Sequence, residues 1–318
     1  MFWEFFKSTG LGVFQILLLS GIGFYLVKKD ILGEGCLVTV SRLSMEVTLP
    51  ALIFCQLIKE FSFSLYPNWW IFPLLSMGIT VLGLAVGAIF SGFISGSEHK
   101  LQFLSLVGFQ NSGFLPLALI AALVPKEQLS AMLIYLFLFL LGFNLVIFSL
   151  GVNLLARSKE AKFELISLFS PPVVATLLGM ALVFFGLNTA VPGFIYTPLK
   201  MLGDCTLPLA MLVVGGNLAQ IRLSRISKKA MVLMSLAKLV ILPALGLLLV
   251  WKFRFPQLLG LLIIIQLAMP PATTSSVIVR QYKKEDLLVS QGIFFGHILS
   301  TLTIPLFLSI YFTLSVIK

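Results

Sequence analysis

Hydrophobic residues along this chain gather into ten long, nearly uncharged stretches with short polar segments between them. A helix needs roughly 20 apolar residues to cross the hydrocarbon core of a bilayer. These stretches are much longer than the roughly 10-residue alternating strands of a membrane barrel. The pattern predicts an all-α integral membrane protein with ten transmembrane helices, over residues 9–27, 36–58, 69–93, 101–124, 129–156, 165–186, 194–220, 229–251, 256–279 and 287–316.

The two halves of the chain share short motifs at a nearly constant offset. The run 46–50, Glu-Val-Thr-Leu-Pro, falls on 204–208, Asp-Cys-Thr-Leu-Pro, and Pro116 of the fourth span falls on Pro270 of the ninth. We therefore expect two five-helix repeats, residues 1–160 and 161–318. Because five is odd, the second copy must be inverted in the membrane, an architecture that recurs in secondary transporters.

Composition and charge agree with a membrane protein. Charged residues make up only 11% of the chain and the mean hydropathy is +1.07, whereas a soluble domain carries about 25% charge. The net charge of +10 would suggest nucleic acid in a soluble protein. Here it suggests basic cytoplasmic loops instead. The loops after odd-numbered spans carry about twice as many Lys and Arg as the opposite face, so we expect both termini to be extracytoplasmic.

The fourth span, residues 108–120, reads GFQNSGFLPLALI and carries polar residues near its middle. Proline removes a backbone donor, glycine weakens a helix, and an Asn such as Asn111 is able to cap a new helical start. The sequence therefore predicts a helix that breaks near the middle of the bilayer.

The ninth span, residues 266–279, reads QLAMPPATTSSVIV. Pro270-Pro271 cannot continue an ordinary helix, and the hydroxyls from Thr273 to Ser276 suit the start of a second half. Half-helix N-termini favour anions, and unwound carbonyls can hold a cation. The alternative is that these prolines only kink the helices, and that Gln110 and Gln266 make interhelical hydrogen bonds.

Three segments, GFQNSGFLPLALI, TLPLAMLVVGGNLA (206–219) and AMPPATTSSVIV, resemble the auxin efflux carrier family, which includes the plant PIN-formed carriers and short prokaryotic members. The resemblance implies the fold of the bile acid:sodium symporters. In that fold, helices 1, 2, 6 and 7 form a scaffold and the homodimer contact. Helices 3–5 and 8–10 form a transport domain that moves as an elevator, and helices 4 and 9 cross as broken helices.

Carried onto this chain, the resemblance places the substrate beside the crossing. The candidate substrate-binding residues are Gln110, Asn111, Ser112, Gly113, Pro116, Asn144, Pro270, Pro271, Thr273 and Thr274. A second group consists of possible pocket or coupling residues, which are Glu46, Cys55, Gln56, Lys238 and Gln266.

Ionisable residues within the expected spans need partners, because a charge there costs at least a few kcal/mol. Glu46 has Arg42 one turn earlier for an ion pair, or it could carry a proton or sodium ion. Asp204 could reach Lys200 in the same way. Lys238 either pairs with an acid or attracts the anionic substrate.

These residues favour a secondary carrier of a small organic anion, a carboxylate of malonate, malate or auxin type. No Walker motif is present, so energy must come from the substrate gradient, the membrane potential or a co-ion. Sodium- or proton-coupled symport is the close alternative, and a membrane sensor that no longer transports is another. We expect no enzyme activity, cofactor, metal apart from a possible sodium site, or nucleic-acid partner. The location expected is the plasma or inner membrane.

Overall fold

A computed structural model describes residues 1–156, 169–221, 226–282 and 286–316, and the regular structure in these segments is helical. Within these segments, seven helices are long and apolar enough to cross a membrane. This result confirms the all-helical membrane class. The seven are Phe2–Lys28, Gly35–Glu60, Ile71–Ser91, Lys126–Leu155, Gly193–Ala219, Lys228–Phe253 and Leu287–Ser315.

Shorter elements join or interrupt these long helices. In the first half they are α1 (Phe2–Lys28), α2 (Glu34–Leu43), a π-helical turn (Ser44–Thr48), α3 (Leu49–Glu60), α4 (Ile71–Ser91), α5 (Ser97–Gly108), α6 (Phe114–Leu123), α7 (Lys126–Val146), a π-helical turn (Ile147–Gly151) and α8 (Val152–Ala156).

The second half has a similar series of elements. They are α9 (Pro171–Phe184), a 3-10 turn (Asn188–Ala190), α10 (Gly193–Asp204), α11 (Thr206–Ala219), α12 (Lys228–Leu236), a π-helical turn (Ala237–Ile241), α13 (Leu242–Phe253), α14 (Gln257–Ala268), α15 (Thr274–Gln281) and α16 (Leu287–Val316).

Some boundaries differ from the sequence-based expectation. The first helix begins at Phe2 rather than near residue 9, because the polar residues Glu4 and Lys7 do not stop a helix in its first turns. The sixth expected span is shorter, since α9 begins at Pro171, and residues 165–168 lie outside the described residues. Residues 109–113 and 269–273 are not helical.

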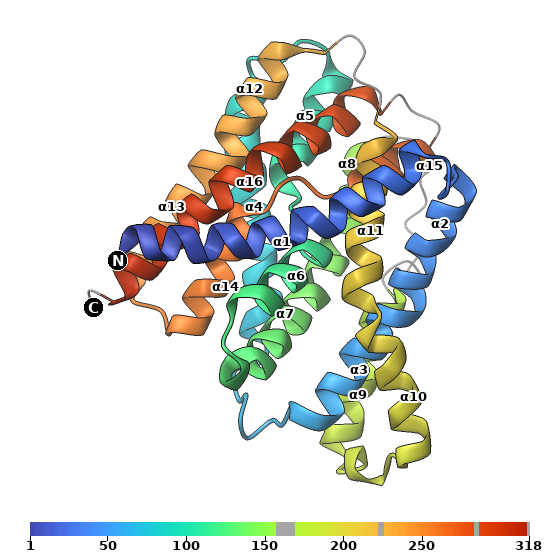
Figure 1. Ribbon diagram of the computed structural model, residues 1–318. Helices are drawn as coiled ribbons and strands as arrows, with labels where there is room; N and C mark the ends of the chain where they lie inside the picture. Colours follow the sequence, from blue (N-terminus) through green and yellow to red (C-terminus); the bar gives the residue numbers. More distant parts are fainter. Residues whose placement is uncertain (157–168, 222–225, 283–285, 317–318) are drawn as a thin grey trace.

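Close packing of small residues brings α1 against α11 (Figure 1). A Cβ added at Gly215 would overlap the backbone carbonyl of Ser20, and one added at Gly23 would overlap that of Leu212. Glycine is therefore required on both sides of this contact, as expected where membrane helices approach closely.

Helices α1 and α16 lie antiparallel, so the two ends of the described chain meet (Figure 1). Thr9 Oγ1 lies 3.0 Å from Ser309 Oγ, and the rings of Phe5 and Phe312 are 5.6 Å apart between centroids. The chain therefore starts and finishes on the same side of the helical bundle.

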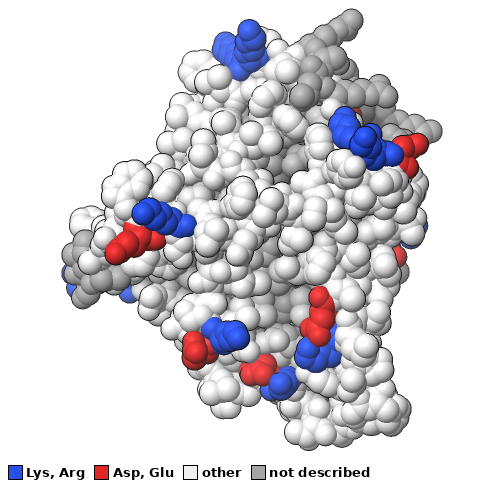
Figure 2. Space-filling view, in the orientation of Figure 1, with Lys and Arg blue, Asp and Glu red and all other residues white. Residues whose placement is uncertain are grey.

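The outer surface is largely apolar, as a surface in contact with lipid must be. In Figure 2 the charged side chains form a few separate groups around a broad uncharged area. Large hydrophobic side chains such as Leu18, Ile89 and Phe184 are exposed. The buried core is richest around α7, whose residues from Leu136 to Phe139 are fully buried.

Candidate functional site

Two non-helical segments, residues 109–113 and 269–273, lie side by side and pair inside the bundle. The N–H of Asn111 donates to the carbonyl of Pro270 at 2.8 Å, and the N–H of Ala272 donates to the carbonyl of Phe109 at 2.9 Å. Gln110 and Pro271 are thereby paired in an antiparallel bridge. We call these two segments the crossing. It brings four helix ends together, namely those of α5, α6, α14 and α15.

Proline and glycine explain why the chain is not helical there. Pro270 and Pro271 have no N–H to donate. The carbonyl of Pro270 and the N–H of Ala272 instead pair across the crossing. Pro116 lies in the first turn of α6, where an N–H would have no partner in the helix. On α16, a Cβ added at Gly296 would come within 2.5 Å of Pro271. A glycine is therefore needed for α16 to pack against the crossing.

The helix starts at the crossing are not capped as expected. The N-cap of α6 is Gly113 rather than Asn111, and Thr273 at the N-cap of α15 makes no side-chain capping bond. The expectation was wrong because the Asn111 amide turns toward His297 instead. The first N–H groups of α6 and α15 thus have no side-chain acceptor from their N-cap residues.

Several buried polar atoms at the crossing have no partner within the described residues. They are both side-chain atoms of Gln110, the Oε1 of Gln266 and the Oγ of Ser275. Leaving one such group unpaired costs roughly 1–3 kcal/mol. Gln266 does donate through Nε2 to the Ser112 carbonyl at 3.3 Å. Gln266 therefore makes a hydrogen bond between the two expected spans, although Ser112 is not helical, whereas the Gln110 side chain makes none with a described residue.

Lys238 is 1% exposed and lies in the π-helical turn that follows α12. Its Nζ donates to the carbonyl of Val107 at 3.0 Å, and no acidic partner is found among the described residues. Of the two alternatives for Lys238, the acid pair is therefore not found within the described part of the chain. The ammonium instead meets the C-terminal end of α5, where carbonyls lack partners and the helix dipole is negative.

The other expected site residues lie in different places. Glu46 is exposed and pairs with Arg42 at 3.1 Å, and Asp204 pairs with Lys200 at 2.7 Å. Both ion pairs expected from the sequence are therefore present. The carboxylate of Glu46 makes no hydrogen bond or ion pair with a described residue of the crossing.

The remaining candidates divide between the crossing and the helices around it. Asn111, Ser112, Pro270 and Pro271 are buried, while Gly113, Thr273 and Thr274 are half-buried. Cys55 is buried on α3 with its Sγ near the Tyr196 carbonyl of α10. Among the described residues, the buried Nε2 of Gln56 has no hydrogen-bond partner, and the side chain of half-buried Asn144 on α7 makes no hydrogen bond.

His297 on α16 is a site residue that the sequence reasoning missed. Its Nε2 lies 3.4 Å from Nδ2 of Asn111, and its Nδ1 lies 2.8 Å from the carbonyl of Ile293. A lone histidine inside an otherwise apolar span was the available signal, because an ionisable residue within a membrane helix suggests function.

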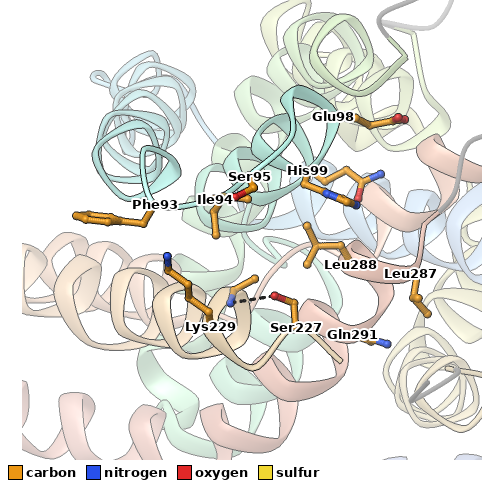
Figure 3. A pocket seen from close by; sticks show the side chains of 12 residues that line it. Phe93, Ile94, Ser95, Glu98, His99, Ser227, Lys229, Leu287, Leu288 and Gln291 are labelled. Carbon is orange, nitrogen blue, oxygen red and sulfur yellow. Dashed lines mark hydrogen bonds between the residues drawn. The ribbon is translucent and has the colours of Figure 1, made fainter. Parts of the chain in front are cut away.

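Cavities lie among these helices, and two of them bear on the site. One of about 340 Å³ is lined by the starts of α5, α12 and α16, including His99, Lys229 and Gln291 (Figure 3). There Ser227 accepts a hydrogen bond from the Ala230 N–H and caps α12. No residue of the crossing lines this cavity, so we do not assign the crossing's ligand to it.

The other cavity, of about 50 Å³, lies between α1, α6, α11 and α16. Its lining is almost entirely apolar and includes Val13, Leu115 and Val214, together with the ring of His297. We call it the apolar chamber. Because His297 also meets Asn111, the chamber adjoins the crossing.

The described residues contain no cluster of His, Cys, Asp or Glu able to hold a metal ion. A single carboxylate, that of Asp286, is held by several donors between the end of α15 and the start of α16. Asp286 accepts hydrogen bonds from Arg280 at 2.5 Å, Ser290 at 2.6 Å and Ser276 at 3.0 Å. Burial raises the pKa of Asp286, but the bonds from Ser290 and Arg280 outweigh burial and hold that pKa below its ordinary value. These bonds fasten α15 to the start of α16.

Comparison with known proteins places this chain in a family. The family model described as "Membrane transport protein" matches residues 11–164 and 158–308. An uncharacterised transporter of Methanothermobacter thermautotrophicus is 27% identical over 92% of this chain and 95% of its own length. The protein PIN-LIKES 1 of Arabidopsis thaliana is 22% identical over 95% of this chain and 78% of its own. An uncharacterised transporter of Methanocaldococcus jannaschii is 23% identical over 92% and 96%. The chain therefore belongs to the membrane transport protein family, the auxin efflux carrier family that its motifs resemble.

Proposed function

We propose that this protein is a secondary transporter of a small organic anion, bound beside the crossing and carried by an elevator-type movement. The observation that carries the proposal is the crossing itself. Two backbone hydrogen bonds hold its segments together while buried polar side chains such as Gln110 stay unpaired. If the crossing had only a structural role, these polar groups would be expected to hydrogen-bond within the protein. In a binding site they are left unpaired so that they can bind a ligand.

The proposed architecture has ten spans in two inverted repeats, residues 1–160 and 161–318. Seven are the long helices; α5 with α6, α9, and α14 with α15 would supply three more. Contact between the start of α1 and the end of α16 supports an even number of crossings. The antiparallel pairing of residues 109–113 with 269–273 supports inverted halves. From the resemblance we also propose a homodimer formed through spans 1, 2, 6 and 7. From the distribution of Lys and Arg we propose that both termini are extracytoplasmic.

An anion suits the donors that the crossing offers. The first N–H groups of α6 lack intrahelical partners and carry partial positive charge. At α15 the N–H groups of Ser275 and Ser276 already donate to the carbonyls of Ala272 and Thr273. The buried ammonium of Lys238 is already directed to Val107, so no free side-chain cation remains beside them among the described residues of the crossing. This donor set fits one carboxylate better than two. We therefore favour an auxin-like monocarboxylate, whose apolar body could enter the apolar chamber when the helices move, over malonate or malate.

Ion coupling remains the alternative form of the same function. Glu46 is engaged by Arg42 at the surface, which leaves carbonyls at the ends of α5 and α14 as the oxygen ligands for sodium. A proton would need a titratable group at the crossing, and His297 is the one that contacts Asn111.

The test is flux into proteoliposomes that contain the purified protein. Labelled indole-3-acetate, malonate and malate are offered with sodium or with potassium, and thermal stabilisation is followed with the same compounds. A ligand at 100 times its Kd stabilises a protein by about 2.7 kcal/mol. We expect flux and stabilisation with indole-3-acetate. Stabilisation without flux would indicate a sensor, and neither effect with any acid would overturn the anion proposal.

A further inference from the structure

His297 is held in one protonation pattern by its neighbours. Its Nδ1 lies 2.8 Å from the carbonyl of Ile293, and since a carbonyl only accepts, Nδ1 must carry the hydrogen. In a neutral ring Nε2 is then a hydrogen-bond acceptor. It faces Nδ2 of Asn111 at 3.4 Å, which is the donor end of that amide. Donors and acceptors agree along the whole chain from Ile293 to Asn111.

Asn111 is fixed at two of its polar groups. Its backbone N–H donates to the carbonyl of Pro270, and its side-chain Nδ2 faces Nε2 of His297. Its Oδ1 receives no hydrogen bond from a described residue. With a neutral His297, Asn111 thus directs a lone-pair acceptor away from the ring, and an acceptor repels an anion.

A second proton on His297 reverses this arrangement. Nε2 would become a donor facing the N–H donors of Asn111, and the amide would rotate by about 180° so that Oδ1 accepts from the ring. Nδ2 is then released as a donor for a carboxylate. The proton comes from water on whichever side the site is open, and it stays on Nε2.

The uncharged surroundings of His297 favour the binding of a proton and an anion together. The elements around the ring present no ionisable side chain among the described residues that line the apolar chamber: α1 offers Val13 and Ile16, α6 offers Leu115, and α11 offers Val214 and Leu218. On α16 itself the lining residues are uncharged, and the ammonium of Lys238 is directed to Val107. An imidazolium there has no counter-charge until an anion arrives, so each ligand favours the other.

We propose that His297 is the positioning residue and proton carrier of the site, so that an anion binds together with one proton. This inference rests on the proposed anion site and assigns its coupling ion. It also predicts the direction of the coupling, because a lower pH should tighten anion binding.

The binding experiment uses indole-3-acetate and measures its Kd between about pH 6 and 8, where a free carboxylate stays ionised. We expect Kd in the wild-type protein to fall up to about tenfold per pH unit of acidification. His297→Gln should retain weaker binding without that pH dependence. The matched control is His99→Gln, which removes the other histidine of the chain and should keep the wild-type profile. Wild-type binding that ignores pH, or a pH profile that survives His297→Gln, would overturn the proposal.

A second measurement needs neither the His297 variant nor a known ligand. Histidine nitrogens are labelled in His99→Gln, so that the NMR signals come from His297 alone. We expect the neutral ring to carry its hydrogen on Nδ1. A ring with its hydrogen on Nε2 would contradict the hydrogen-bond pattern and overturn the inference. If the ring carries its hydrogen on Nδ1 but no carboxylate binds, the anion proposal has failed, and the coupling proposal fails with it. The NMR and binding results together therefore separate an error in the hydrogen-bond pattern from an error in the proposed substrate.

Discussion

Lys238 donates a hydrogen bond from its buried ammonium to the backbone carbonyl of Val107, across 3.0 Å and between two segments 131 residues apart in sequence. The bond joins the turn after α12 to the last turn of α5, just before the crossing. It therefore connects an ammonium buried inside an expected span to the helix end that leads into the crossing.

Removing that ammonium should cost stability. Lys238→Met keeps the apolar stem but leaves the Val107 carbonyl without this donor, so we expect a loss of about 1–3 kcal/mol. The melting temperature in detergent checks it. Lys252→Met, on exposed Lys252 of α13, is the matched control and should change little. If Lys238→Met is as stable as the wild type while anion binding weakens, Lys238 acts on the substrate instead.

Asn111→Ala should remove anion binding while the protein still folds. Alanine keeps the backbone N–H that donates to Pro270, so the crossing should persist, but the amide donor is lost. A hydrogen bond to a charged group contributes about 1.5–3 kcal/mol, so we expect Kd for indole-3-acetate to rise at least about tenfold and flux to fall to background. Asn153→Ala, on exposed Asn153 of α8, serves as the control. Unchanged flux in Asn111→Ala would remove Asn111 from the site.

The sequence was enough for the class of fold but not for the contacts at the site. Spans are readable because crossing a bilayer demands length and apolarity, and the positions of Pro270, Pro271 and Pro116 show where a helix cannot continue. The partner of Lys238 is a backbone carbonyl, which no residue letter reveals. His297 and Asn111 lie 186 residues apart, so only the packing of α16 against the crossing brings them together.

Gly215→Ala should destabilise the contact between α1 and α11. The added methyl group would overlap the Ser20 carbonyl, and backbone cannot move aside as a flexible side chain does. Forcing extra volume into a packed contact costs about 1–3 kcal/mol. Gly21→Ala is the matched control, because a Cβ there meets nothing within 4 Å. Equal melting temperatures for the two variants would show that the close approach of α1 and α11 is not needed.

Replacing both Pro270 and Pro271 by Ala should weaken anion binding by letting the chain after α14 continue as a helix. The two new N–H groups would satisfy helical carbonyls, and the carbonyl at position 270 would no longer be free for Asn111. We expect Kd for indole-3-acetate to rise by at least about tenfold, since the pairing that holds four helix ends is lost. Pro198→Ala, inside α10, restores a backbone donor away from the crossing and should bind normally. Wild-type affinity in the double variant would mean that the crossing does not depend on its prolines.

Asp286→Asn should loosen α15 in a way that depends on pH. Hydrogen bonds from Ser290 and Arg280 hold the pKa of Asp286 below its ordinary value. A carboxyl whose pKa is lowered by folding stabilises the folded state above its unfolded pKa of about 3.9, and this contribution is lost as the pH falls through the folded value. We therefore expect Asp286→Asn to lower the free energy of unfolding at neutral pH by about 1–3 kcal/mol. Its melting temperature should then lie below that of the wild type.

The same two proteins should converge in acid, because the wild-type carboxyl is then protonated and resembles the amide. Melting curves at about pH 7 and about pH 3 test this convergence. Asp204→Asn is the control, since Asp204 and Lys200 are both exposed and exposed pairs contribute little. A stability gap for Asp286→Asn that stays constant with pH would show that the lost contact is one of shape and not of charge.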